Sequence, residues 1–198
     1  MKKLIYITSF LLFVAVSSAT AQSYSTFSYS VGIPTSDLGD FISKTSWRGV
    51  TYDYRKLVQP NIGVGFTVGW NVFYEEKGSA TYTIDNRSLT GKQWRYSNNF
   101  PLLVAADYYI KPGEDLNPFV GLGLGTLYTN RTTDMGIYRL ERDAWSFAFQ
   151  PEVGIKYSIN YYAGLNLSLK YFYGLQAGDF NGDQSYLAFN IGYVFMGK

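Results

Sequence analysis

A set of charged residues lies on the polar side of alternating sequence runs and offers the first candidates for chemistry. Five of them fall inside these runs and Arg55 lies near the end of one: Asp53, Asp107, Glu152, Lys156 and Lys170. Opposite charges facing each other in a narrow interior are expected to pair, because an unpaired buried charge costs several kcal/mol. The set therefore predicts a plug of ion pairs and hydrogen bonds. A gated path for protons or small ions is the alternative, and acid–base catalysis by paired carboxylates is a third, weaker one.

Other catalytic and cofactor chemistries find little support in the sequence. Histidine and cysteine are both absent, which excludes thiol nucleophiles, histidine bases and Cys or His metal sites. The repeat Gly121, Gly123, Gly125 has Thr126 where a nucleotide-binding loop needs its last glycine. Asp179, Asn181 and Asp183 have the spacing of calcium ligands, but the rest of an EF-hand pattern is missing, so at most a weak surface cation site is expected. We expect no cofactor, no metal and no enzymatic activity.

Alternation with a period of two residues is the dominant pattern and predicts β-strands. One face of nearly every strand is strongly apolar, whereas the other carries Gly, Ser, Asn, Gln and the charges. Aromatic residues are abundant, with 19 Tyr, 14 Phe and 4 Trp, and many lie toward the strand ends. Eight such runs are found, with apolar faces centred on these residues: Tyr29, Tyr52, Phe66, Val104, Leu122, Val153, Leu167 and Ile191.

The connections between these runs alternate in length. Short turns with Pro, Asn or Gly are expected at residues 56–61, 111–117 and 158–163. Long polar loops are expected at residues 34–46, 75–95, 129–143 and 176–185, although alternation in residues 80–84 indicates that the strands flanking the second loop continue as a hairpin. This arrangement is typical of an all-β, eight-stranded antiparallel up-and-down transmembrane barrel, with short periplasmic turns and long extracellular loops.

The first 21 residues have the pattern of a cleaved signal peptide. Lys2 and Lys3 precede an apolar run of about 13 residues, too short to span a bilayer, and Ala19-Thr20-Ala21 provides a cleavage site. Residues 22–198 would then form the barrel domain. Without the two lysines its basic and acidic residues are equal in number, 15 each, so no nucleic-acid partner is expected.

The sequence resembles the small eight-stranded outer-membrane barrels of the OmpA transmembrane domain, OmpX and OmpW types. The stretches that carry the resemblance are residues 118–125, PFVGLGLG, and residues 186–195, YLAFNIGYVF. The resemblance implies recognition of the C-terminal strand by the barrel assembly machinery, although Phe195 is followed by three further residues. It also implies that enzymes of this group need a catalytic histidine, which this chain lacks.

These observations predict a monomeric, non-enzymatic barrel in the outer membrane of a Gram-negative bacterium, with a structural, adhesion or surface-interaction role. Its expected partners are membrane lipid and lipopolysaccharide, with Arg131, Arg139 and Arg142 as a candidate phosphate site, and an extracellular protein bound through the long loops. A narrow OmpW-like channel for small or hydrophobic solutes is the second interpretation. A soluble exported barrel that binds a ligand is the third.

Overall fold

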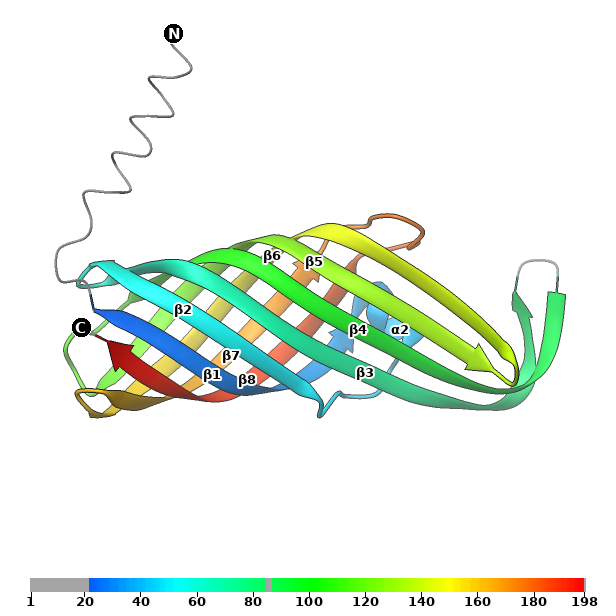
Figure 1. Ribbon diagram of the computed structural model, residues 1–198, viewed down its shortest axis with the longest axis horizontal. Helices are drawn as coiled ribbons and strands as arrows, with labels where there is room; N and C mark the ends of the chain where they lie inside the picture. The colour runs from blue at the N-terminus through cyan, green and yellow to red at the C-terminus, as the bar shows by residue number, and fades with distance from the viewer. Residues whose placement is uncertain (1–21, 85–86, 198) are drawn as a thin grey trace, which may run out of the picture.

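The computed structural model describes residues 22–84 and 87–197, so the predicted signal peptide lies outside the described residues. Within these residues, eight antiparallel strands pair in sequence order and form a closed barrel (Figure 1). The predicted fold is therefore confirmed. The strands are β1 (Ser23–Thr35), β2 (Gly49–Gln59), β3 (Ile62–Ile84), β4 (Arg87–Tyr109), β5 (Leu116–Met135), β6 (Tyr138–Asn160), β7 (Ala163–Gly174) and β8 (Gln184–Gly197).

The last strand closes the barrel on the first along its whole length. The register runs from Ser23 opposite Gly197 to Thr35 opposite Ser185, so neither strand is left with an open edge there. Ser23 and Gly197 therefore lie at the same end of the barrel as the three short turns. We call this the short-turn end, and the opposite one the long-loop end.

The two faces of the wall are arranged as the alternation predicts, with apolar side chains outside. Along β4, for example, Leu102 and Val104 are 54% and 67% exposed, whereas Leu103 and Ala105 between them are 1% and 3% exposed. A soluble barrel has the opposite arrangement, because water must solvate its outer face. This outward apolar belt fits the hydrocarbon of a bilayer, in which only a closed sheet leaves no backbone group unpaired. No helix within residues 22–84 and 87–197 has the length and hydropathy to cross a membrane.

An aromatic row marks the long-loop side of the belt. Trp70 stacks on Phe100 with ring centroids 5.8 Å apart, and the contacts continue through Tyr128 to Trp145 across four neighbouring strands. Amphipathic rings favour the interface between hydrocarbon and water, so this row fits the boundary of the membrane-spanning wall on the side of the long-loop end.

Two of the four predicted long loops are instead strands. β3 and β4 run to Ile84 and from Arg87, and β5 and β6 run to Met135 and from Tyr138, so both hairpins rise beyond the aromatic row. The hairpin predicted from residues 80–84 is confirmed, but the prediction of a loop at 129–143 is wrong. Its cause is physical: above a membrane both faces of a strand meet water, so the period-two alternation of apolar residues disappears.

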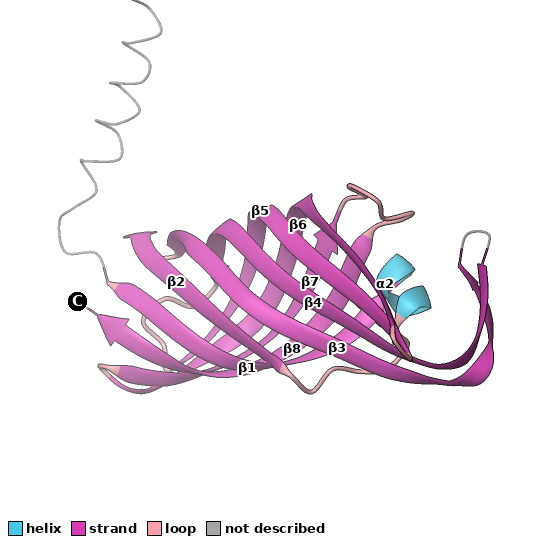
Figure 2. Ribbon diagram, turned by 45° about the vertical axis from the view of Figure 1, so that its right-hand side comes forward, coloured by secondary structure: helices cyan, strands magenta, loops and turns pink. Residues whose placement is uncertain are grey.

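The first predicted long loop contains a short helix that the sequence analysis did not foresee. Helix α2 (Ser36–Phe41) follows β1 directly and folds back toward the barrel at its long-loop end (Figure 2). Leu38 of this helix and Ile42 just after it are both fully buried. Six residues are too few for a stable isolated helix, so these apolar contacts must hold it in place.

Candidate functional site

The lumen is filled by side chains, and its charged centre is the arrangement that the sequence predicted most directly. The five predicted residues and Arg55 all face the interior and are between 0% and 6% exposed: Asp53, Asp107, Glu152, Lys156 and Lys170. Three cations thus face three carboxylates, so this part of the lumen is electrically balanced.

Arg55 lies at the centre of the cluster. Its Nε donates to Asp107 Oδ2 at 2.9 Å, while its terminal nitrogen lies 3.6 Å from Asp53 Oδ1 and 3.9 Å from Glu152 Oε2. It also donates to the carbonyl oxygen of Phe66 at 2.7 Å. A planar guanidinium has five N–H donors in a fixed fork, so it can address several acceptors on different sides at once. From the sequence, Arg55 was expected only near a strand end and outside the central set of charges.

Lys170 closes the other side of the same cluster. Its Nζ donates to both carboxylate oxygens of Asp53, at 2.6 and 2.7 Å, and lies 3.6 Å from Glu152 Oε1. Thr67 donates to Asp53 Oδ1 at 2.7 Å, and Gln150 donates to Glu152 at 3.1 Å. We call Asp53, Arg55, Asp107, Glu152 and Lys170 the ionic layer.

The ionic layer combines residues that lie at different distances from the short turns along their strands. Asp107 is two residues from the end of β4, whereas Glu152 is eight residues from the end of β6. Strands of a small barrel tilt by about 40° and are staggered, so residues at different distances from their turns meet at one level. Among the five charged residues predicted from the sequence, Lys156 lies outside the ionic layer, nearer to the short-turn end.

Lys156 is held by aromatic rings instead of by a carboxylate. Its Nζ lies 4.5 Å from the ring centre of Tyr24, 4.6 Å from that of Tyr109 and 5.0 Å from that of Phe119. It also donates to the Tyr109 hydroxyl at 2.6 Å. Cation–π contacts of this kind are strongest where water is excluded. We call these four residues the lysine cage.

Glycines on the inner wall make room for these large side chains. A Cβ atom at Gly121 would lie 2.5 Å from Asp107 Oδ1, and one at Gly154 would lie 2.6 Å from the Phe119 ring. Both neighbours are on the adjacent strand.

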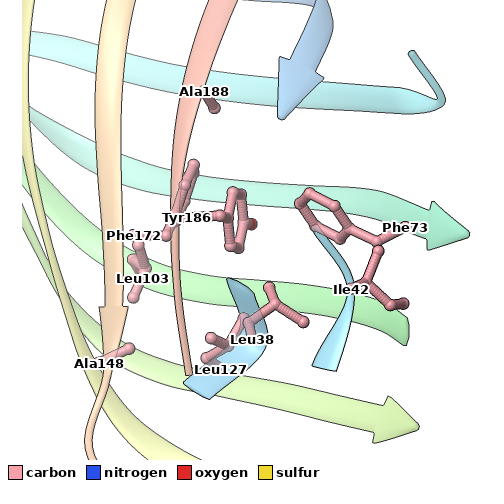
Figure 3. Close-up of a cluster of buried hydrophobic side chains, with 9 residues drawn as sticks. All are labelled: Leu38, Ile42, Phe73, Leu103, Leu127, Ala148, Phe172, Tyr186 and Ala188. Atoms are coloured by element: carbon pink, nitrogen blue, oxygen red, sulfur yellow. The ribbon is translucent and has the colours of Figure 1, made fainter. Parts of the chain in front are cut away.

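Toward the long-loop end, an apolar layer follows the ionic layer. Figure 3 shows the side chains of this apolar layer. Its members come from the strand walls and from the α2 segment: Leu38, Ile42, Phe73, Leu103, Leu127, Ala148, Phe172, Tyr186 and Ala188. The Tyr186 ring stacks on Phe172, with centroids 4.7 Å apart, and meets Phe73 edge-on at 5.4 Å. Two chemically different layers therefore fill the lumen in series.

Arg131 fastens α2 in the barrel mouth. Its guanidinium is 2.8 Å from Asp37 Oδ2 and lies between the rings of Phe41 and Phe180, at 4.8 and 4.9 Å from their centres. It also donates to the side-chain oxygen of Gln184. The predicted phosphate site at Arg131, Arg139 and Arg142 is therefore not supported, because Arg131 turns inward.

Two other predicted loop sites also have local partners. Arg139 donates to both carboxylate oxygens of Asp134, at 2.6 and 2.9 Å. In the 179–183 segment, Asp183 accepts the backbone N–H of Gln176 at 2.9 Å and the Tyr173 hydroxyl, so the carboxylate shapes the loop.

A known protein family and several solved structures share this architecture. The family model of the outer membrane protein β-barrel domain matches residues 7–195, and no curated protein sequence matches the chain. Ail of Yersinia pestis, the attachment invasion locus protein solved with the heparin analogue sucrose octasulfate, has a TM-score of 0.57 at 12% identity, covering 89% of this chain and 99% of Ail. OprG of Pseudomonas aeruginosa has a TM-score of 0.51 at 14% identity, covering 89% and 93%. At these identities the likeness concerns the fold alone.

Proposed function

Since the chain belongs to the outer membrane protein β-barrel domain family and is a protein of the outer membrane, we propose that it is a non-enzymatic surface protein whose protruding strands bind another protein outside the cell. In such barrels the short turns face the periplasm, so the long-loop end is extracellular. The two long hairpins β3–β4 and β5–β6 then stand above the outer leaflet.

The observation that carries this proposal is the edge of β6. Residues 138–146 of β6 pair with β5 on one side, from Tyr138 opposite Met135 to Ser146 opposite Leu127. On the other side, pairing with β7 begins only at Ala148, opposite Gly174, and Gly178 of the following loop lies against Asp143 and Ala144. The open edge of β6 is therefore residues 138–142. A row of backbone donors and acceptors on a protruding strand is a template to which an extended segment of another protein can add.

The side chains of this edge favour selective binding over self-association. Arg139, Glu141 and Arg142 place charges of both signs along it. Charged side chains on an exposed edge discourage pairing with a second identical edge. A partner with complementary charges would still be accepted, because strand addition takes its affinity from the backbone and its selectivity from side chains.

The filled lumen supports this role over the channel interpretation. The ionic layer and the apolar layer lie in series between the two mouths, and the buried carboxylates are engaged by Arg55 and Lys170. These groups stiffen the wall that carries the hairpins. Ail, which has the same fold, is described as an attachment invasion locus protein, a role of the same kind.

A shortened β5–β6 hairpin tests the proposal. Residues 132–141 are removed and Arg131 is joined to Arg142 by Asn-Gly, since these two residues are directly opposed and a two-residue turn can connect them. Bacteria that display the full chain or the shortened chain are compared for adhesion to surfaces coated with host matrix proteins. We expect adhesion of the full chain and its loss in the shortened one.

Ile137→Asn is the matched control, because Ile137 is 94% exposed at the hairpin tip but lies outside the strand edge. Adhesion by this variant should equal that of the unaltered chain. Unchanged adhesion of the shortened chain, with normal surface display, would disprove the proposal. Steady conductance of the purified full chain in planar bilayers would favour the channel instead.

A further inference from the structure

A cavity opens at the periplasmic mouth of the barrel, on the opposite side of the membrane from the hairpins. It has a volume of 520 Å³ and lies between the start of β1, the β4–β5 turn and the end of β6. Volumes of this size are typical of sites for small molecules. Its lining is mixed in polarity, with Tyr24, Asn117, Lys156 and Ser158 among the residues that contribute.

The lysine cage forms the inner end of this cavity. Lys156 is only 6% exposed, and the Tyr109 hydroxyl is its sole hydrogen-bond acceptor among the described residues. An ammonium group has three N–H donors, so two remain for a ligand. No carboxylate of the described residues contacts the ammonium directly, because Asp107 is reached only through the Tyr109 hydroxyl, which donates to its Oδ2 at 3.3 Å. An anion brought to Lys156 would further stabilise the buried charge.

The outer rim carries the opposite charge. Glu114 is paired with Lys111 at 2.9 Å, whereas the side chain of Asp115 has no hydrogen-bond or ionic partner among residues 22–84 and 87–197. The turn is held in position, because the backbone N–H of Ser158 donates to the carbonyl oxygen of Asp115 at 2.7 Å. The cavity therefore has a cationic inner end and an anionic rim.

We propose that this cavity binds the free carboxyl end of a short peptide, with the carboxylate on Lys156 and the amino group at Asp115. A phosphate or other multiply charged anion fits less well, because Glu114 and Asp115 would repel it. The side-chain NH2 of Asn117, whose Oδ1 accepts the backbone N–H of Lys111, and the hydroxyl of Ser158 offer hydrogen bonds to peptide groups between the two ends. This site is independent of the proposed surface function, since it faces the periplasm.

The test is isothermal titration calorimetry of the full chain in lipid nanodiscs with three probes: the dipeptide Ala-Ala, its C-terminal amide and its N-acetyl form. We expect saturable binding of Ala-Ala and binding of the amide weaker by about tenfold or more, since a hydrogen-bonded charge is lost. N-acetyl-Ala-Ala should bind with an intermediate affinity. No binding of Ala-Ala, or equal binding of Ala-Ala and its amide, would overturn the proposal.

Variants then assign the two ends. Lys156→Met keeps a side chain of similar length among the rings and should weaken Ala-Ala by about tenfold or more. Asp115→Asn should weaken Ala-Ala but leave N-acetyl-Ala-Ala unchanged, because only the former has an amino group. Lys92→Met removes a positive charge from the distant β3–β4 hairpin and should change neither affinity. If Lys156→Met fails to fold, the exposed Asp115→Asn variant and the three probes decide the question alone.

Inorganic phosphate serves as the competing ligand. We expect it to displace Ala-Ala only weakly. Displacement by phosphate as effective as by Ala-Ala itself would show a general anion site and overturn the assignment to a peptide.

Discussion

Lys170 Nζ lies 2.6 and 2.7 Å from the two carboxylate oxygens of Asp53, although 117 residues separate the two along the chain. The pair joins β7 to β2 across the lumen, and these strands are not neighbours in the barrel. Both side chains are buried, so solvent screens the interaction little. The contact therefore ties together parts of the wall that the backbone ladder does not connect directly.

Lys170→Met should destabilise the barrel strongly, because Asp53 would keep only the more distant Arg55 as a counter-charge. Removing one partner of a buried ion pair typically costs about 3–5 kcal/mol. Urea unfolding in detergent micelles, followed by the gel mobility of unboiled samples, measures the loss.

The double variant Asp53→Asn with Lys170→Met is the control for this prediction. It removes both charges, so it should recover much of the stability lost in the single variant. Equal stability of Lys170→Met and the unaltered chain would show that the pair contributes nothing.

The wall of the barrel could be predicted from the sequence because each position in the bilayer faces either lipid or lumen. Val104 and Asp107 were assigned to the correct faces by alternation alone, and the structure agrees. Contacts across the lumen depend instead on stagger and tilt, which the sequence does not display. For this reason Arg55 appeared peripheral, yet it forms ion pairs with three carboxylates.

Helix α2 was missed for a different reason. Its six residues contain Gly39 and are too few to show a helical period, although Thr35 is a residue type that favours the start of a helix. Leu38 and Ile42 stabilise it by burial against residues from distant strands such as Phe73 and Tyr186. A helix fixed by tertiary contacts gives little local signal.

Arg131→Met should loosen α2 in the barrel mouth. The variant loses the ion pair with Asp37 and the hydrogen bond to Gln184, and it leaves Asp37 without its cation. A loss of about 2 kcal/mol in the local opening free energy corresponds to roughly 30-fold faster exchange of the Ile42 amide, which donates to Leu38.

Arg139→Met is the matched control for the Arg131→Met variant. Arg139 also pairs with an aspartate, Asp134, but its side chain is 66% exposed, so solvent screens the pair and it should contribute little to stability. Hydrogen exchange at Ile42 should be unchanged in this variant. Similar exchange rates in both variants would contradict the assigned role of Arg131.

The attachment of Ser43, in the segment after α2, to Glu75 should depend on pH. Glu75 lies beyond the aromatic row, on the side of the long-loop end. Burial alone would raise the pKa of Glu75, but the Ser43 N–H and hydroxyl, at 2.8 and 3.0 Å, and the Lys77 ammonium lower it below the ordinary 4.5. A lowered pKa in the folded state means that the stabilisation is complete above about pH 4.5 and is lost as the pH falls through the folded value.

The amide chemical shift of Ser43, measured by NMR between pH 2.5 and 7, should therefore be constant at neutral pH and change only in the acid range, below the ordinary carboxyl value of 4.5. Glu75→Gln should remove that change, since it has no titrating group. A transition above pH 5 in the unaltered chain would contradict the prediction.

Conductance should require both lumen layers to be opened. Arg55→Ser shortens the central side chain of the ionic layer, but Phe73, Phe172 and Tyr186 still close the passage above it. Planar bilayers should therefore show no steady current for the unaltered chain or for Arg55→Ser.

The same substitution combined with replacement of residues 36–42 by a Gly-Ser linker removes Leu38 and Ile42 from the apolar layer and should produce a small steady current. The linker alone is the control and should stay silent, because the ionic layer remains. A current from Arg55→Ser alone would show that the apolar layer is no barrier to ions. If the combined variant carries no current although its gel mobility shows an intact barrel, the wall residues close the lumen without α2.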